Sequence, residues 1–153
     1  VAIMLSNYSG ADIIAEFENI QYKGKGFSED ETTAYYTVKG ERVRSKSEKI
    51  IADTLNRKGI PYHYDLPLEL KYRNRTIVMY PDFTVLNKRT GKRYILEHLG
   101  MMDKPSYYES AMWKIDVYEK NGILLGDRLL ITHETAGSPL DTNVLEEYVE
   151  WLL

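Results

Sequence analysis

Two acidic residues lie inside stretches that otherwise have the composition of buried strands. Asp82 interrupts residues 77–86, and Glu97 interrupts residues 93–99; both stretches are rich in β-branched and aromatic side chains. Burying an ionised carboxylate without a partner is costly, so acids in such positions need a specific counterpart. Asp82 and Glu97 are therefore the first candidates for chemistry.

A strong turn signal separates the two acidic stretches. The segment 87–92, Asn-Lys-Arg-Thr-Gly-Lys, predicts the loop of a β-hairpin. The midpoint of positions 82 and 97 falls at the centre of this loop. In a regular hairpin Asp82 and Glu97 would therefore be directly opposed and point to the same face. A bulge, or a position beyond the sheet edge, would instead turn them apart.

A facing carboxylate pair calls for a counter-charge. Two like charges about 5 Å apart repel by roughly 3 kcal/mol at an effective dielectric constant near 20. A divalent cation would supply the positive charge. The chain has no cysteine and three histidines without zinc-type spacing, which points to oxygen ligands and hence to Mg²⁺ or Mn²⁺. Pro81, which lacks a backbone donor, favours an edge or a bend here.

Two further charged residues flank this pair. Glu48 lies three residues after Ser45, the spacing of a capping box at a helix N-terminus, and a capping role is compatible with a second role as an acid. Lys114 and Tyr118 are four residues apart on a predicted helix and hence share one face. Lys114 could reach toward the hairpin, or it could be a surface lysine whose stem lies along the helix.

The elements that would position these residues follow from periodicity and end signals. Residues 1–40 are an N-terminal extension with a short helix near residues 12–17. The rest, 41–153, forms one domain in the order α-β-β-β-α-β-α, predicted at residues 46–58, 66–72, 77–86, 93–99, 103–120, 129–132 and 143–153. The first three strands are predicted to form an antiparallel meander, with the fourth added after a helical crossover. This is an α/β fold with a mixed four-stranded sheet flanked by helices.

The ordered set of motifs resembles the PD-(D/E)xK nuclease superfamily, with its restriction-endonuclease-like core. The resemblance covers residues 41–153, within an uncharacterised bacterial branch. It rests on a helix with Glu48, a Pro-Asp pair on a strand, Glu97 on the next strand, and a helix with Lys114 and Tyr118. The matching segments are Val-Arg-Ser-Lys-Ser-Glu at 43–48, Tyr-Pro-Asp-Phe at 80–83, and Glu-His-Leu-Gly-Met-Met-Asp at 97–103.

The resemblance implies a role for each matching residue. Asp82, Glu97 and the backbone carbonyl of His98 would hold the metal ion, and Glu48 would be an outer ligand or would position water. The family places a lysine two residues after the second acid, where this chain has Leu99. Some branches carry that lysine on the following helix, so its role is carried over to Lys114, supported by Tyr118. The His98 side chain is expected to orient neighbouring groups rather than to act as a base.

The resemblance also implies hydrolysis of phosphodiester bonds, with nucleic acid, DNA before RNA, as the substrate. Residues 41–75 contain nine Lys or Arg against five acids, although the whole chain has a net charge of −3. Four of these cations lie near the start of the first long helix, where Ser45 is the expected cap. They are the candidates for contacts to the phosphate backbone: Arg42, Arg44, Lys46 and Lys49.

Two other interpretations stay open. Leu99 in the lysine position and the acidic net charge also fit a catalytically weak or inactive module that binds nucleic acid, and an accessory structural domain is a third possibility. The sequence has no apolar run of about 20 residues, so no membrane partner is expected. The lack of cysteine fits a reducing compartment, and we expect a cytoplasmic location. A homodimer and a part of a longer protein are both compatible with the sequence.

Overall fold

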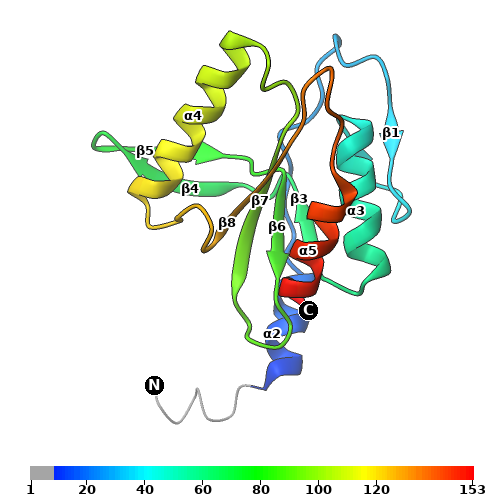
Figure 1. Ribbon diagram of the computed structural model, residues 1–153. Coiled ribbons are helices and arrows are strands. Elements are labelled where there is room, and N and C mark those ends of the chain that lie inside the picture. The colour runs from blue at the N-terminus through cyan, green and yellow to red at the C-terminus, as the bar shows by residue number, and fades with distance from the viewer. Residues whose placement is uncertain (1–8) are drawn as a thin grey trace.

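The computed structural model describes residues 9–153 (Figure 1). Its helices and its strands are each numbered in their order along the chain. The helices are α2 (Gly10–Glu18), α3 (Lys46–Arg57), α4 (Pro105–Lys120) and α5 (Thr142–Leu152). The strands are β1 (Tyr35–Tyr36), β2 (Arg42–Val43), β3 (Tyr62–Tyr64), β4 (Leu68–Tyr72), β5 (Arg75–Met79), β6 (Phe83–Leu86), β7 (Arg93–Leu99) and β8 (Leu129–His133).

The central sheet has four strands in the order β3-β6-β7-β8. The pairs β3–β6 and β6–β7 are antiparallel, whereas β8 lies parallel to β7. Helix α4 lies between β7 and β8 in the chain, as a parallel connection requires. The predicted class, an α/β fold with a mixed four-stranded sheet flanked by helices, is therefore confirmed.

Helices α3 and α5 lie on one side of this sheet and α4 lies on the other (Figure 1), and a hydrophobic cluster fills each side. One cluster joins Ile51 of α3 and Val149 of α5 to the sheet, and the other joins Val117 of α4 to the β4–β5 hairpin. Because side chains alternate along a strand, Leu96 of β7 enters the first cluster and Ile95 enters the second. Glu97 shares the side of Ile95 and therefore faces α4.

The strand predictions need two corrections. Residues 77–86 are not one strand: the chain bends at Asp82, so β5 and β6 belong to different sheets. Pro81 explains the break, since it cannot donate to a ladder. The predicted strand 66–72 does pair antiparallel with the first part of the 77–86 stretch, but β4 and β5 form a separate two-stranded sheet instead of joining the central one. Its predicted place beside β6 is occupied by β3, which is too short to show periodicity.

The helix ends follow the local signals more closely. The side chain of Ser45 accepts a hydrogen bond from the Glu48 amide at 3.1 Å, and Gly59, with a φ of 71°, follows the last turn of α3. The reciprocal half of the predicted capping box is wrong, because the Glu48 carboxylate accepts from the amide of Arg44 instead. Pro105 occupies the start of α4 as predicted. None of the helices within residues 9–153 has the length and apolar character needed to cross a bilayer.

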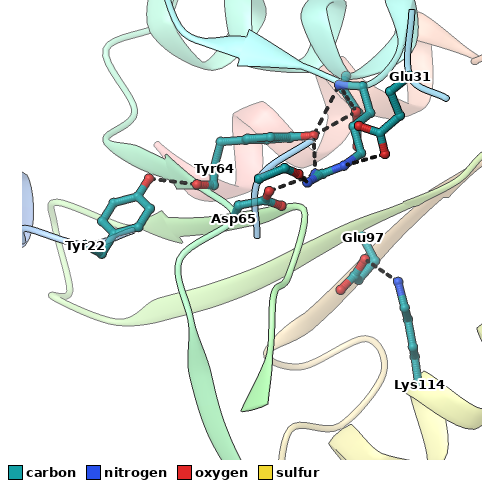
Figure 2. A network of polar contacts seen from close by, with 9 residues as sticks. Tyr22, Glu31, Tyr64, Asp65, Glu97 and Lys114 are labelled. Atoms are coloured by element: carbon teal, nitrogen blue, oxygen red, sulfur yellow. Dashed lines mark hydrogen bonds and ion pairs between the residues drawn. The ribbon is translucent and has the colours of Figure 1, made fainter. Parts of the chain in front are cut away.

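The segment that precedes residue 41 packs on β3. Phe17 of α2 is almost fully buried, and its carbonyl lies 2.6 Å from a ring nitrogen of His63. Tyr22 donates a hydrogen bond to the carbonyl of Tyr64 at 2.7 Å (Figure 2). The short helix expected near residues 12–17 is present and extends over the whole of α2. The first part of the predicted extension, residues 1–8, lies outside the described residues.

Candidate active site

The β6–β7 hairpin brings the two candidate acids together. The strands pair Phe83 with Leu96, so the same register continued by one residue sets Asp82 opposite Glu97. The predicted register is therefore confirmed. Asp82 lies just beyond the end of β6, and its Oδ2 atom accepts a hydrogen bond from the amide of His98 at 2.7 Å. This bond holds the Asp82 carboxylate against the backbone of β7.

Glu97 is the most deeply buried acid of the site. Its side chain is 3% exposed, and its Oε1 atom accepts a hydrogen bond from the hydroxyl of Tyr118 at 2.5 Å. Within residues 9–153, the other oxygen, Oε2, is buried without a hydrogen-bond donor. The Nζ atom of Lys114 lies 3.9 Å from Oε2, and Figure 2 shows this side chain reaching from α4 toward the carboxylate. Oε2 therefore has an ion-pair partner in the described part of the chain but no hydrogen-bond donor there.

The charges around Asp82 and Glu97 do not cancel. Burial and the charge of Asp82 raise the pKa of Glu97 well above its usual range, although Lys114 and Tyr118 act in the opposite direction. Burial lowers the pKa of Lys114, but the charges of Glu97 and Asp82 more than offset this, and the pKa is raised. The ammonium therefore stays protonated near neutral pH, yet one cation faces two carboxylates.

Glu48 enters the site from the first turn of α3. Its Oε1 atom accepts hydrogen bonds from the amide of Arg44 at 2.9 Å and from the hydroxyl of Tyr64 at 3.1 Å. Burial, followed by the charge of Asp82, raises the pKa of Glu48 to about 7. Glu48 can therefore change its protonation state near neutral pH.

A cleft of about 380 Å³ joins these groups. Its wall includes Glu48, Asp82 and Lys114, three of the four residues predicted to take part in catalysis, and Glu97 lies behind them as the ion-pair partner of Lys114. The complete lining is Arg44, Ser45, Glu48, Asp82, His98, Gly100, Met101, Tyr107, Lys114 and Glu134. The structure thus assembles at one opening acids that are far apart in the sequence.

The His98 side chain is held at both ring nitrogens. Nδ1 lies 2.7 Å from the Thr132 hydroxyl, and Nε2 lies 2.6 Å from the Glu134 carboxylate, which also accepts a hydrogen bond from Ser47. This arrangement suits an orienting role, as predicted, because neither nitrogen is free to take a proton from a water molecule. Sequence reasoning missed Glu134 and Ser47, since only the parallel pairing of β7 with β8 brings residue 134 to His98.

Tyr107 is a further residue of the cleft that was not predicted as functional. Its hydroxyl accepts a hydrogen bond from the Gly100 amide at 2.8 Å and lies 3.4 Å from the carbonyl of His98, the predicted third metal ligand. The sequence did hold a signal for Tyr107. Its spacing from Lys114 and Tyr118 places all three side chains on one face of α4.

Most of the cations expected to contact nucleic acid are engaged by the protein itself. The Arg44 guanidinium forms an ion pair of 2.7 Å with the buried Asp65, which is labelled in Figure 2, and it also donates to a backbone carbonyl. Arg42 donates to another backbone carbonyl, and Lys49 pairs with Asp53 at 3.0 Å. The side chain of Lys46 is exposed and makes no ion pair or hydrogen bond within residues 9–153. In this part of the chain, Lys46 alone among the four has a charge that faces solvent without a protein partner.

The chemistry of the donors decides whether a metal ion would suit this cleft. Within residues 9–153 no three His, Asp or Glu side chains are already grouped as a complete metal site. Asp82, Glu97 and the carbonyl of His98 nevertheless offer oxygen atoms alone, and one buried oxygen of Glu97 has no donor. Mg²⁺ and Mn²⁺ prefer oxygen ligands, and Mg²⁺ commonly keeps several water molecules beside one or two carboxylates. The residues therefore fit such an ion.

Comparison with known proteins adds little about function. No protein-family model matches the chain, and no solved structure matches it. The chain is 30% identical over 125 residues to an uncharacterised protein of Methanocaldococcus jannaschii. The alignment covers 72% of this chain and 10% of that protein, so the chain spans about a tenth of the length of this relative. The restriction-endonuclease-like core stays a prediction.

Proposed function

We propose that this protein is a metal-dependent phosphodiester hydrolase acting on nucleic acid, with DNA as the first substrate to test. One observation carries the proposal. Within residues 9–153, the Oε2 atom of Glu97 is buried near Asp82 without a hydrogen-bond donor, and Lys114 approaches it to 3.9 Å at an open cleft. Burial and the charge of Asp82 disfavour the ionised form of Glu97, a divalent cation would favour it, and a metal-bound water is a nucleophile for phosphodiester hydrolysis.

Asp82, Glu97 and the carbonyl of His98 would hold the ion. When bound there, a divalent cation lowers the pKa of a coordinated water and stabilises negative charge on the phosphate. Tyr118 keeps Glu97 in place through its 2.5 Å hydrogen bond, and the His98 amide keeps Asp82 in place. These contacts orient the ligands before any ion arrives, which is the usual role of the groups around a metal site.

The remaining side chains supply proton and charge chemistry. Lys114, whose pKa is raised, carries a positive charge that would offset the charge developing on the phosphate. Glu48 has a pKa of about 7, which suits a group that accepts a proton from the attacking water near neutral pH. Glu48 and Lys114 reach the cleft from α3 and α4, so substrate would bind between the two helices.

A second candidate function is a nucleic-acid-binding module that cleaves poorly or not at all. Leu99 occupies the family's lysine position and is 5% exposed within the core. Few cations also remain to bind a substrate, because Arg42, Arg44 and Lys49 already interact with protein groups. This candidate requires binding that survives when the acids of the cleft are changed.

The decisive experiment is a cleavage assay on labelled linear DNA, circular DNA and RNA. Each substrate is incubated with Mg²⁺, with Mn²⁺ and with a chelator. Asp82→Asn is compared with Asp127→Asn, a matched change of an exposed aspartate that pairs with Lys92. An asparagine at position 82 can still accept the hydrogen bond from the His98 amide, so Asp82→Asn is expected to fold.

Metal-dependent cleavage that is lost in Asp82→Asn and kept in Asp127→Asn would support the nuclease proposal. Cleavage that persists in chelator, or in Asp82→Asn, would contradict it. Absence of cleavage on every substrate, with binding intact in both variants, would favour the second candidate.

A further inference from the structure

An aromatic and basic surface lies on α4 and the β4–β5 hairpin. We call it the hairpin–helix surface and define it by Tyr72, Arg73, Arg75 and Trp113. In Figure 1 the hairpin lies beside α4, and its tip projects away from the central sheet. The proposed catalytic chemistry makes no use of this surface.

The two aromatic rings of this surface contact each other. The rings of Trp113 and Tyr72 are 5.7 Å apart and nearly perpendicular, and the guanidinium of Arg73 lies 5.3 Å from the centre of the Tyr72 ring. Trp113 is 43% exposed. The exposed part of the indole can contact a ligand, and unlike Trp151 it lies on a surface that also carries Arg73 and Arg75.

The hairpin–helix surface and the candidate active site share helix α4. Trp113 precedes Lys114 in this helix, and the Nζ atom of Lys114 is 3.9 Å from Glu97. The other strand of the hairpin, β5, ends at Met79, three residues before Asp82. The same two elements therefore carry the surface and lead to the candidate site.

The charges of the hairpin complement phosphate. Residues 68–79 contain Lys71, Arg73 and Arg75 against Glu69, a balance of +2 in a chain whose net charge is −3. Arg73 and Arg75 are exposed and form no salt bridge within residues 9–153. These two arginines are therefore free to contact anions, unlike Arg44 at the cleft.

The combination of cations and exposed rings distinguishes between kinds of nucleic acid. Bases of a single strand can stack on protein aromatic rings, which contributes about 1–3 kcal/mol per base. Bases inside a duplex are already stacked on each other and present only their edges. A surface for duplex alone would need the cations but not the rings.

From these observations we infer that the hairpin–helix surface binds a single-stranded segment of nucleic acid, with a base against Trp113 and phosphates against Arg73 and Arg75. This inference rests on the proposed function for its substrate and narrows that substrate to single strands or unpaired ends. It does not depend on the metal ion, so binding can be measured where cleavage cannot occur.

Two tryptophans in the chain permit a direct test. Trp151 of α5 is a matched control, since it is 48% exposed and its ring packs edge-on against Tyr94 at 5.6 Å. Trp151→Phe leaves Trp113 as the fluorescent reporter, and Trp113→Phe leaves Trp151. Each variant is titrated with an oligothymidine strand in chelator at low salt, alongside a duplex of equal length.

We expect saturable quenching of Trp113 by the single strand and little change in Trp151. Trp113→Ala should weaken binding about tenfold, as loss of one stacked base does. Changing Arg73 and Arg75 together to Gln should also lower the dependence of binding on salt. Circular dichroism of each variant shows whether the fold is retained, and the fluorescence of Trp151 in Trp113→Phe gives a second check.

Three outcomes would overturn the inference: no response of Trp113, equal or tighter binding of the duplex, or a Trp113-dependent dimer in sedimentation without nucleic acid. The last would show that a second copy of the chain covers this surface. The two proposals fail separately. Cleavage without a Trp113 response would reject the surface alone, whereas a Trp113 response without cleavage on any substrate would reject the catalytic proposal alone.

Discussion

Glu48 and Glu97 reach the neighbourhood of Asp82 from different elements, and their carboxylates are satisfied to different degrees. On the side of α3, the Oε1 atom of Glu48 accepts two hydrogen bonds, from the Arg44 amide and from Tyr64. On the side of α4, the Oε1 atom of Glu97 accepts one, and within residues 9–153 its Oε2 atom is buried without a donor. Both acids are buried, so burial alone does not account for the difference.

The difference separates an acid that the fold itself supports from one that the fold leaves incomplete. Glu48 lies in the first turn of α3, where the Arg44 amide and Tyr64 hold its carboxylate. Glu97 has one such donor, and within residues 9–153 its other oxygen is buried with none, which lowers stability. We therefore expect changes of Glu97 and of its partner Lys114 to affect activity more than changes of Glu48.

The largest effect is expected for Glu97→Gln. Cleavage should fall by at least about 10²-fold because a proposed metal ligand is lost. The free energy of unfolding without metal should rise by about 1 kcal/mol, since a neutral amide replaces a buried carboxylate with an unpaired oxygen. Metal-dependent cleavage and urea unfolding measure the two effects. Glu119→Gln, an exposed position of α4, is the control; a loss of stability in Glu97→Gln would contradict this interpretation.

Lys114→Ala should lower cleavage by about 10²-fold, because the charge that offsets the developing phosphate charge is removed. It should not weaken Mn²⁺ binding, since Lys114 is a cation, whereas Glu97→Gln should weaken it. Calorimetric titration with Mn²⁺ distinguishes the two variants. Lys120→Ala, which breaks an exposed ion pair on the same helix, is the matched control. Full activity of Lys114→Ala would exclude the carried-over lysine role.

Glu48 should make stability depend on pH in a defined direction. Its pKa is about 7 in the folded protein and near the ordinary 4.5 when unfolded, so the folded state holds this proton more tightly. The contribution of Glu48 is therefore greatest below pH 4.5 and is lost as the pH rises through 7. Between pH 5 and pH 8 the wild type should lose on the order of 2 kcal/mol more than Glu48→Gln. Urea unfolding in chelator measures this, and parallel curves for the two proteins would contradict it.

The smallest effect is expected from Lys46. Lys46→Ala should weaken nucleic-acid binding severalfold. It should also reduce the slope of the log of the binding constant against the log of salt concentration by about one, the value for one phosphate contact. Lys49→Ala removes the same charge from the same helix, but Lys49 is paired with Asp53. It should therefore change binding less. Equal effects in the two variants would show that the charge of α3 acts as a whole rather than through Lys46.

Local signals predicted the site better than they predicted the sheet. The pairing of Asp82 with Glu97 could be predicted because a hairpin's register depends on its own turn and on a period of two residues. The start of α3 at Ser45 and the start of α4 at Pro105 are likewise decided within a few residues. The place of the 66–72 segment was wrong because nothing local distinguishes a strand of the central sheet from one in a separate hairpin.

The sequence by itself therefore determined the helices, the β6–β7 register and the opposition of two carboxylates. Only the tertiary structure decided that Tyr64 would bind Glu48, that Glu134 would hold His98, and that Arg44 would be engaged within the protein. The reason is physical. Turns, caps and hairpins depend on neighbours in the chain, whereas these contacts join elements 16 to 36 residues apart, whose meeting depends on how the two hydrophobic clusters pack against the sheet.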